Sequence, residues 1–198
     1  TEFAPAKINL NLHVCGKRSD DYHLLHSLVV FASDIGDQIS ASHSEDLELE
    51  ITGLFAHQLD QAARDTSRQS SNLVIKAAYL LADMAGIAPN ASIRLEKNLP
   101  VSSGIGGGSS DAAATIKTLC TLWNINPDNE KLSAALLKLG ADMPVCYARQ
   151  SVIMQGIGEQ LTPYNGLPAL PAVLVNPLIP CSTQAVFRNF KGEFLKPV

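Results

Sequence analysis

Residues 99–114 read LPVSSGIGGGSSDAAA and hold four of the thirteen glycines in this 198-residue chain. The glycines at positions 104, 106, 107 and 108 allow positive φ angles and let the backbone approach a ligand closely. The segment runs directly into a predicted helix, whose first free amides and dipole attract an anion. Ser109 and Ser110 could add hydroxyl donors, although Ser110 could instead cap the helix. The pattern therefore indicates a cradle for the phosphates of a nucleoside triphosphate.

Two other phosphate-binding motifs do not fit this segment. A P-loop requires GxxxxGK[ST], and no lysine follows these glycines. A dinucleotide-binding fingerprint requires GxGxxG, and Ser109 stands where its third glycine would fall when counted from Gly104. The remaining alternative is a flexible loop before a capped helix, because a lone glycine run also occurs in proteins without a phosphate site.

Strands are predicted on the N-terminal side of the glycine segment. Apolar residues alternate with polar ones over residues 7–14, which predicts one half-buried strand. A turn at 16–21 leads to a second apolar run at 24–32, and the sequence SDIGD at 33–37 predicts another turn. Further strands are predicted at 38–42 and 47–52, followed by an irregular loop at 57–71.

Helices and strands are both predicted around and after the glycine segment. Apolar spacing predicts a helix over 72–85, a strand over 91–96 and a helix that follows the glycines as far as Trp123. Asn126 and Pro127 suit the cap and first turn of a helix that ends near Leu139. The remaining predicted elements are strands at 152–155 and 172–176 and a short helix at 183–190. This mixture predicts the α+β class.

Lys7 and Asp142 are the candidate catalytic residues, although each is ambiguous alone. Lys7 begins a predicted strand, where a lysine is usually an edge or surface charge. Asp142 lies between Gly140 and Pro144, where an aspartate commonly occupies a turn or caps a helix. Phosphoryl transfer needs charge neutralisation and often a carboxylate that accepts the proton of the attacking hydroxyl. The sequence does not show whether these two residues meet in space.

The composition restricts the class of protein. Hydrophobic residues make up 46% of the chain, which is enough for a sizeable core, and the net charge of −4 disfavours a nucleic-acid-binding protein. The four cysteines form no CxxC pair, which predicts reduced thiols rather than a disulfide frame or a zinc site. The sequence shows neither a secretion signal nor an apolar run of membrane-spanning length, so a cytoplasmic protein without membrane contact is expected.

Four segments, in the same order, resemble the GHMP kinase superfamily. They are PAKINL at 5–10, GKRSDDYH at 16–23, the glycine segment, and GADMPV at 140–145. The glycine segment by itself indicates only the superfamily, which includes kinases for homoserine, mevalonate and galactose. GKRSDDYH after PAKINL is similar to the branch that phosphorylates the 2-hydroxyl of a cytidine-diphosphate-linked methylerythritol in the non-mevalonate isoprenoid pathway. The similarity runs over nearly the whole chain.

The resemblance implies a role for the catalytic and substrate-binding residues. It implies ATP as the phosphoryl donor, Mg²⁺ as its expected companion, and a small-molecule acceptor that carries a cytidine diphosphate group; the protein is expected to be a monomer or a homodimer. Asp142 would act as general base, Lys7 would orient it and stabilise charge, and Asn9 would lie near the reacting hydroxyl. The other substrate-binding residues would be Tyr22, His23, Thr183 and Phe187. In this arrangement Tyr22 and His23 hold the cytosine, and Phe187 stacks on the opposite face of the base. The alternative for Phe187 is an ordinary core residue of a helix.

The resemblance also implies the residues that bind ATP. They are Asn72, Lys97, Pro100, Val101, Ser102, Ser103, Gly104, Ile105, Gly106, Gly107, Gly108, Ser109 and Ser110. Asn72 has the alternative role of a helix N-cap, and Lys97 that of a solvated charge at the end of a strand. No metal-ligating residues are predicted, because no dedicated carboxylate cage is evident.

The implied fold is the GHMP kinase fold, and two features depart from the family pattern. An N-terminal ATP-binding domain, like domain 2 of ribosomal protein S5, is expected at residues 1–150 and the start of a C-terminal substrate domain at 151–198. Asp21 stands where the family usually has glycine, and aspartate tolerates a left-handed conformation better than most residues. No second glycine-rich motif follows Asp142, so a C-terminally truncated kinase is expected. A kinase for homoserine or mevalonate and an inactive nucleotide-binding fragment are the alternatives.

Overall fold

The computed structural model describes residues 1–179 and 181–197 and has the predicted mixture of strands and helices. One seven-stranded sheet has the order β4-β5-β3-β6-β7, with β1 and β2 also paired to β3. Its pairings are antiparallel except for β4 and β5, which are parallel and are connected through α1. The strands are β1 (Glu2–Asn9), β2 (His13–Lys17), β3 (His23–Ser42), β4 (Leu47–Thr52), β5 (Ala91–Glu96), β6 (Val152–Gly156) and β7 (Gln160–Pro163).

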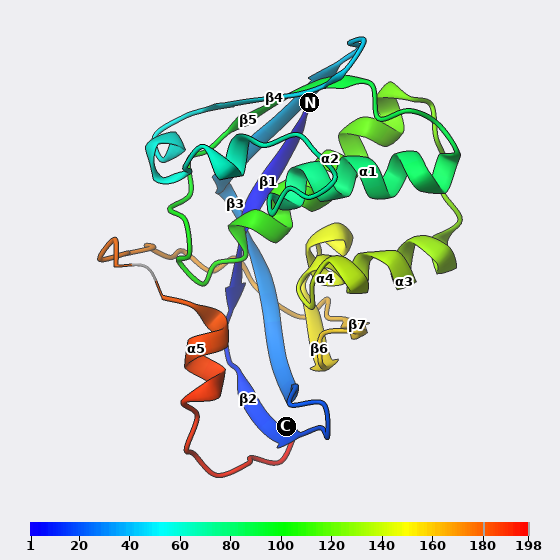
Figure 1. Ribbon diagram of the computed structural model, residues 1–198. Helices are drawn as coiled ribbons and strands as arrows, with labels where there is room; N and C mark the ends of the chain where they lie inside the picture. The colour runs from blue at the N-terminus through cyan, green and yellow to red at the C-terminus, as the bar shows by residue number, and fades with distance from the viewer. Residues whose placement is uncertain (180, 198) are drawn as a thin grey trace.

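The helices α1–α4 gather on one side of the sheet, and α5 lies apart from them, beside β2 (Figure 1). Between the helices and the sheet lies the core, in which Ile75 of α1, Ile116 and Leu119 of α2 and Ile93 of β5 are fully buried. The helices are α1 (Leu73–Ala85), α2 (Gly107–Leu122), α3 (Asn129–Leu139), α4 (Met143–Ala148) and α5 (Thr183–Arg188), with short 3-10 turns at Ala56–Gln58 and Ala62–Arg64.

Several helix and strand predictions are confirmed, because their signals are local. α1 begins after Asn72, whose side chain accepts a hydrogen bond from the Val74 amide, and it ends at Gly86 in the left-handed conformation. β5 has the predicted bounds, and the glycine segment leads into α2 as expected. The cap of α3 is Asp128 instead of the predicted Asn126, because the Asp128 carboxylate reaches the Lys131 amide.

The predicted strand over residues 7–14 is interrupted, and its apolar residues do not all face the core. A bulge between Pro5 and Lys7 shifts the pairing of β1 with β3, and such a shift changes which side chains face inward. Lys7 is therefore only 4% exposed, whereas Leu10 and Leu12 between β1 and β2 are 45% and 43% exposed. Lys7 is thus a buried residue and not the edge or surface charge that is usual for a lysine at the start of a strand.

The predicted turn at residues 33–37 is wrong, because β3 continues through it as one strand of 20 residues. Gly36 lets β3 and β1 lie close together, because a Cβ atom at this position would be only 2.5 Å from the Ala4 carbonyl oxygen. Asp37 is fully buried and is stabilised by partners far away in the sequence. Turn-forming residue types thus occur inside a strand for tertiary reasons.

The C-terminal part of the described chain differs from the prediction in two ways. Residues 172–176 form no strand, and Val173 and Val175 are 86% and 87% exposed without a partner strand in the described part of the chain. β6 and β7 pair onto β3, so the expected domain boundary at residue 150 falls within the sheet. We propose a boundary after Pro163, where the sheet ends.

Candidate active site

The glycine segment is packed directly against Lys7 of β1. The Lys7 amide donates a hydrogen bond of 2.8 Å to the Ile105 carbonyl oxygen. Gly106 has a φ of 67°, and a Cβ atom on it would lie 2.9 Å from the Cβ of Lys7. Because only glycine satisfies both conditions, Gly106 brings the loop and the lysine together.

The loop ends at the uncapped N-terminus of α2. The helix begins at Gly107, and no side chain forms a cap hydrogen bond there. The Ser110 amide already bonds within the helix, to Gly106 at 2.8 Å, so the amides of Gly107, Gly108 and Ser109 are the ones that a helix leaves open. Open amides at the positive end of a helix dipole are the groups that bind anions in proteins, and this 16-residue helix offers them at the end of the loop.

Lys7 and Asp142 meet beside this loop, as the family resemblance implied. The Lys7 Nζ lies 3.4 Å from Asp142 Oδ1, and the Asp142 side chain remains 39% exposed. Asn9 joins the pair, because its Oδ1 accepts a hydrogen bond of 2.8 Å from Lys7 Nζ. The structure therefore brings together a buried ammonium, an amide and a carboxylate that is open to a ligand.

Asp142 occupies the first position before α4 but does not cap the helix through its side chain. Its carboxylate is therefore available for chemistry, and the alternative of a capping aspartate is not what the structure shows. The preceding residue, Ala141, packs against the turn between β6 and β7. Gly158 in that turn has a φ of 117°, and any Cβ atom there would collide with the Ala141 carbonyl oxygen. This contact supports the segment that carries the carboxylate.

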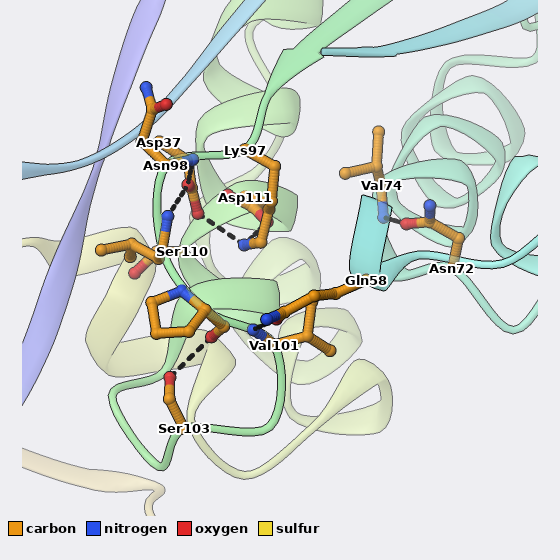
Figure 2. A network of polar contacts seen from close by, with 12 residues as sticks. Asp37, Gln58, Asn72, Val74, Lys97, Asn98, Val101, Ser103, Ser110 and Asp111 are labelled. Atoms are coloured by element: carbon orange, nitrogen blue, oxygen red, sulfur yellow. Dashed lines mark hydrogen bonds and ion pairs between the residues drawn. The ribbon is translucent and has the colours of Figure 1, made fainter. Parts of the chain in front are cut away.

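Residues at the start of the glycine segment are held mainly by the protein itself. Gln58 Oε1 accepts a hydrogen bond of 2.9 Å from the Val101 amide, and Ser103 Oγ donates one of 2.7 Å to the Pro100 carbonyl oxygen (Figure 2). The Cys181 amide bonds to the Ser102 carbonyl oxygen at 3.1 Å. A pocket of about 390 Å³ opens beside this stretch, lined by Gln58, Pro100, Val101, Ser102 and Leu178.

The hydroxyl of Ser110 points into the protein. Ser110 is 2% exposed, and its Oγ donates a hydrogen bond of 3.5 Å to the sulfur of Cys146. Burial raises the pKa of Cys146 to about 12, so this thiol stays protonated and unreactive at neutral pH. Of the two predicted hydroxyl donors, Ser109 is therefore the one placed nearer the surface. All four cysteines are free in the structure.

Lys97 and Asn72 lie next to the loop, but their polar groups are engaged inside the protein. Lys97 is 4% exposed and pairs with the carboxylates of Asp37 and Asp111. Asn72 uses its Oδ1 to cap α1 and its Nδ2 to reach the Ala63 carbonyl oxygen at 2.7 Å. The N-cap alternative is thus correct for Asn72, and the solvated-charge alternative is excluded for Lys97.

The residues predicted to bind cytosine gather between β2, β3 and α5. The rings of His23 and Phe187 stack on each other, with centroids 5.2 Å apart and 24° between their planes, and Phe190 meets His23 edge-on at 5.8 Å. That spacing is typical of a direct aromatic pair, so no base fits between the two rings in this structure. Tyr22 is 55% exposed, and Thr183 is the first residue of α5 and is also exposed. Asp21 before them adopts the left-handed conformation, with a φ of 69°, and so replaces the usual glycine.

Four residues of the site were not identified from the sequence: Ser27, Asp37, Gln58 and Asp111. Asp37 lay in the segment read as a turn, and Asp111 follows the two serines in the glycine segment without fitting a phosphate motif. An acidic residue on the inner face of a helix could have signalled a buried charge pair. Ser27 and Gln58 carried no local signal, because their partners are distant in sequence.

The described residues contain no preformed metal site and no membrane span. No group of three or more histidine, cysteine, aspartate or glutamate side chains in residues 1–179 and 181–197 is arranged to hold a metal ion. Within the same residues, no helix is both long and apolar enough to cross a membrane.

Comparisons with known proteins agree on one family. Residues 72–150 match the family model for the GHMP kinases N terminal domain. The chain is 51% identical over 191 residues to the 4-diphosphocytidyl-2-C-methyl-D-erythritol kinase of Paramagnetospirillum magneticum, covering 96% of this chain and 64% of that relative. The corresponding kinase of Ruegeria pomeroyi is 51% identical over 187 residues, with 94% and 62% covered. The chain thus spans a little under two thirds of the length of these curated relatives.

Solved structures extend the comparison to the fold. The crystal structure of a 4-(cytidine 5'-diphospho)-2C-methyl-D-erythritol kinase superposes with a TM-score of 0.72 at 32% identity, covering 100% of this chain and 67% of that one. A homoserine kinase from Cytophaga hutchinsonii superposes with a TM-score of 0.54 at 17% identity, covering 77% of this chain and 47% of that one, and shares the fold alone.

The family-model match over residues 72–150 and the superposition over the whole chain show that this is a GHMP kinase fold. Within this class, the chain belongs to the family of the 4-diphosphocytidyl-2-C-methyl-D-erythritol kinases, of which it resembles a solved member over its whole length. The family inferred from the sequence motifs is therefore confirmed.

Proposed function

We propose that this chain provides the phosphate loop and the general base of an enzyme that phosphorylates 4-diphosphocytidyl-2-C-methyl-D-erythritol. The donor is ATP, and the acceptor is the 2-hydroxyl of the methylerythritol unit. The observation that carries the proposal is the Lys7–Asp142 pair at 3.4 Å, placed beside a loop that Lys7 itself helps to hold. A carboxylate next to a cation and a cradle of open amides is the arrangement that phosphoryl transfer requires.

In the proposed reaction, Asp142 accepts the proton of the 2-hydroxyl as its oxygen attacks the γ-phosphorus. The bond from this phosphorus to the bridging oxygen of ATP breaks, and ADP leaves. Lys7 neutralises the negative charge that develops near Asp142, and Asn9 holds the Lys7 ammonium in place through their 2.8 Å hydrogen bond. The open amides of α2 stabilise the phosphates of the donor.

Magnesium is part of the proposal as a companion of ATP. The described residues offer no dedicated carboxylate cage for the ion, because no group of three or more histidine, cysteine, aspartate or glutamate side chains is arranged there to hold a metal, and Asp142 beside Lys7 is assigned to the proton. Mg²⁺ commonly takes one or two protein carboxylates and fills its shell with phosphate oxygens and water. When bound, the ion would neutralise phosphate charge.

The cytosine is proposed to bind at the aromatic cluster of Tyr22, His23 and Phe187. Since His23 and Phe187 already stack on each other, the base would lie on the exposed Tyr22 side of His23, with Phe187 supporting the imidazole from behind. Thr183 at the start of α5 would contact the same substrate. A cytoplasmic location is proposed as well, in keeping with four free thiols.

The test of the general base is Asp142→Asn in the protein at its natural length. We expect kcat to fall by about 10²–10⁴-fold, the usual contribution of general base catalysis, because an amide cannot accept the proton. ATP affinity should change little, since the loop and the size of the side chain are preserved. ADP release in a coupled assay gives kcat, and isothermal titration gives ATP affinity.

The matched control is Asp34→Asn, which makes the same chemical change at an exposed position of β3. It should leave both quantities unchanged. Normal turnover in Asp142→Asn would reject the assignment of this residue as the base.

Competition between substrates separates the alternatives. The proposed enzyme should use 4-diphosphocytidyl-2-C-methyl-D-erythritol and ignore homoserine and mevalonate. Turnover of either simple alcohol would favour another kinase of the class, and ATP binding without turnover of any of them would indicate a non-catalytic nucleotide-binding protein.

A further inference from the structure

Three ionisable side chains are buried behind the phosphate loop and take no part in the proposed chemistry. Lys97 is 4% exposed, Asp37 is fully buried and Asp111 is 3% exposed. Lys97 Nζ lies 2.5 Å from Asp37 Oδ2 and 2.7 Å from Asp111 Oδ2. Figure 2 shows the lysine pointing between the two carboxylates, on the inner side of the loop.

Asp37 is also bonded to the loop backbone. Its Oδ1 accepts hydrogen bonds from the amides of Asn98, at 2.5 Å, and Leu99, at 2.7 Å, where the chain leaves β5 and enters the loop. Its Oδ2 is bonded to Lys97. Both oxygens of this one carboxylate are thus occupied, by three donors in total.

Lys97 carries the connection to the other end of the loop. Asp111, its second partner, lies in the second turn of α2, whose N-terminus forms the anion site. A Cβ atom on Gly107 would lie 3.1 Å from Lys97 Nζ, so the ammonium sits directly behind the first residue of the helix. Asp37 and Lys97 therefore connect β3, the entrance of the loop and the start of α2.

The net charge of Asp37, Lys97 and Asp111 affects whether phosphates can bind at the start of α2. Two carboxylates and one ammonium would leave a net negative charge in a dry interior, which is costly and would repel phosphates. Burial, together with the negative charge of Asp37, raises the pKa of Asp111 well above its usual value. Asp111 Oδ1 also has no hydrogen-bond partner among the described residues. A shift of the pKa in this direction favours the protonated form of Asp111, which reduces the net negative charge beside the start of α2.

We propose that Asp37 is the positioning residue of the phosphate loop: it anchors the Asn98 and Leu99 amides and, through Lys97, the start of α2, without touching the nucleotide. Lys97 acts through the same anchor rather than as a ligand of ATP. This inference rests on the proposed function for its kinetic test, whereas its structural test is independent of any ligand.

The two buried aspartates respond differently to the same substitution. In Asp37→Asn, the amide NH₂ must face a donor in either orientation, because Lys97 and the two backbone amides occupy both oxygens. In Asp111→Asn, the amide oxygen can keep Lys97 and the NH₂ can take the position of Oδ1, which faces no partner. Glu50→Gln is the matched control, since Glu50 forms an exposed pair with Arg94 at 2.7 Å on the same sheet.

We expect Asp37→Asn to raise the KM for ATP by about tenfold or more, the loss typical of an unsatisfied buried polar group. The KM for the alcohol substrate should stay within about twofold in the same variant. Asp111→Asn should raise the KM for ATP by less than about threefold, and Glu50→Gln should not change it. Equal losses in both aspartate variants, or no loss in Asp37→Asn, would overturn the proposal. If the unaltered protein binds no ATP in a titration, the proposed function fails instead.

Hydrogen exchange keeps the anchor testable even if Asp37→Asn does not fold. In the unaltered protein without nucleotide, the amides of Asn98 and Leu99 should exchange as slowly as that of Leu95 in β5. Exchange as fast as that of the exposed Gly104 would show that Asp37 does not hold the loop entrance.

Discussion

The Asn9 side chain lies between a charged donor and a buried hydroxyl. Its Oδ1 accepts from Lys7 Nζ at 2.8 Å, and its Nδ2 donates to Ser27 Oγ at 2.6 Å. Ser27 in turn donates to the Asn11 carbonyl oxygen at 2.6 Å. This chain of bonds allows only one orientation of the amide, because a rotated amide would direct its NH₂ at the lysine. A fully buried serine thus determines how the lysine beside Asp142 is held.

Ser27→Ala tests this chain of hydrogen bonds. The Asn9 amide loses its acceptor in a partly buried place, which costs at most about 1–3 kcal/mol and frees the amide to rotate away from Lys7. We expect kcat to fall by about tenfold while the KM for ATP is nearly unchanged, because the phosphate loop is not touched. Steady-state kinetics measure the two separately. Ser33→Ala, at an exposed position of the same strand, is the control; an equal effect there would contradict the prediction.

Within the glycine loop, two glycines adopt the left-handed backbone conformation but have different surroundings. Gly104 and Gly106 have φ values of 75° and 67°. A Cβ atom on Gly104 meets nothing within 4 Å, whereas one on Gly106 would lie 2.9 Å from the Cβ of Lys7. The first glycine therefore supplies conformation only, and the second supplies both conformation and close packing.

Alanine substitutions separate these two contributions. Gly104→Ala should lower the free energy of unfolding by about 1–2 kcal/mol, the cost of a left-handed alanine. Gly106→Ala should cost more than Gly104→Ala, and it should also lower kcat, because the added methyl group displaces Lys7. Urea denaturation and the coupled assay measure the two effects. If the free energy of unfolding falls by the same amount in both variants and Gly106→Ala keeps full kcat, the contact between Gly106 and Lys7 contributes neither to stability nor to catalysis.

At the scale of the molecule, the site exists because one sheet connects distant parts of the chain. Lys7 comes from β1, Asp142 from the start of α4, and the phosphate loop from the connection between β5 and α2. β3 pairs with both β1 and β5 and carries Asp37, so it holds the lysine and the loop in one frame. Displacing any of these strands would separate Asp142, Lys7 and the glycine loop.

The buried aspartate on α2 should make the stability of the whole protein depend on pH. Burial raises the pKa of Asp111 well above its usual value of 3.8 in the folded protein, and this shift is lost when the chain unfolds. Its contribution to stability is complete below that value and is lost as the pH rises toward its raised folded pKa. Asp111→Asn removes this dependence.

The unfolding free energy of Asp111→Asn, relative to that of the unaltered protein, should therefore increase with pH. The limit for one group is about 1.4 kcal/mol per pH unit. Urea denaturation of both proteins at several values between about pH 5 and pH 8 measures the difference. Parallel curves over this range would show that Asp111 is ionised in the folded protein.

Local signals in the sequence identified most elements and the family. Asn72 and Gly86 mark the two ends of α1, the strand predicted at 91–96 is β5, and the glycines predicted a loop before α2. In each case the interacting residues are close in sequence. These inferences succeed because hydrogen bonds of helices and caps join residues a few positions apart. The link between Lys7 and Asp142, by contrast, was implied only by the family resemblance.

The features of the fold and of the candidate site that the sequence did not predict depend on contacts between residues far apart in the chain. A bulge in β1 placed Lys7 in the interior, β3 continued through a segment rich in turn-forming residues, and Asp37 found Lys97 across 60 residues of sequence. Tertiary packing also buries the side chains of Ser110 and Lys97 and stacks the ring of His23 on that of Phe187. No local pattern encodes these outcomes, because the face that a side chain presents and the charge that it meets depend on which strands pair and in which register.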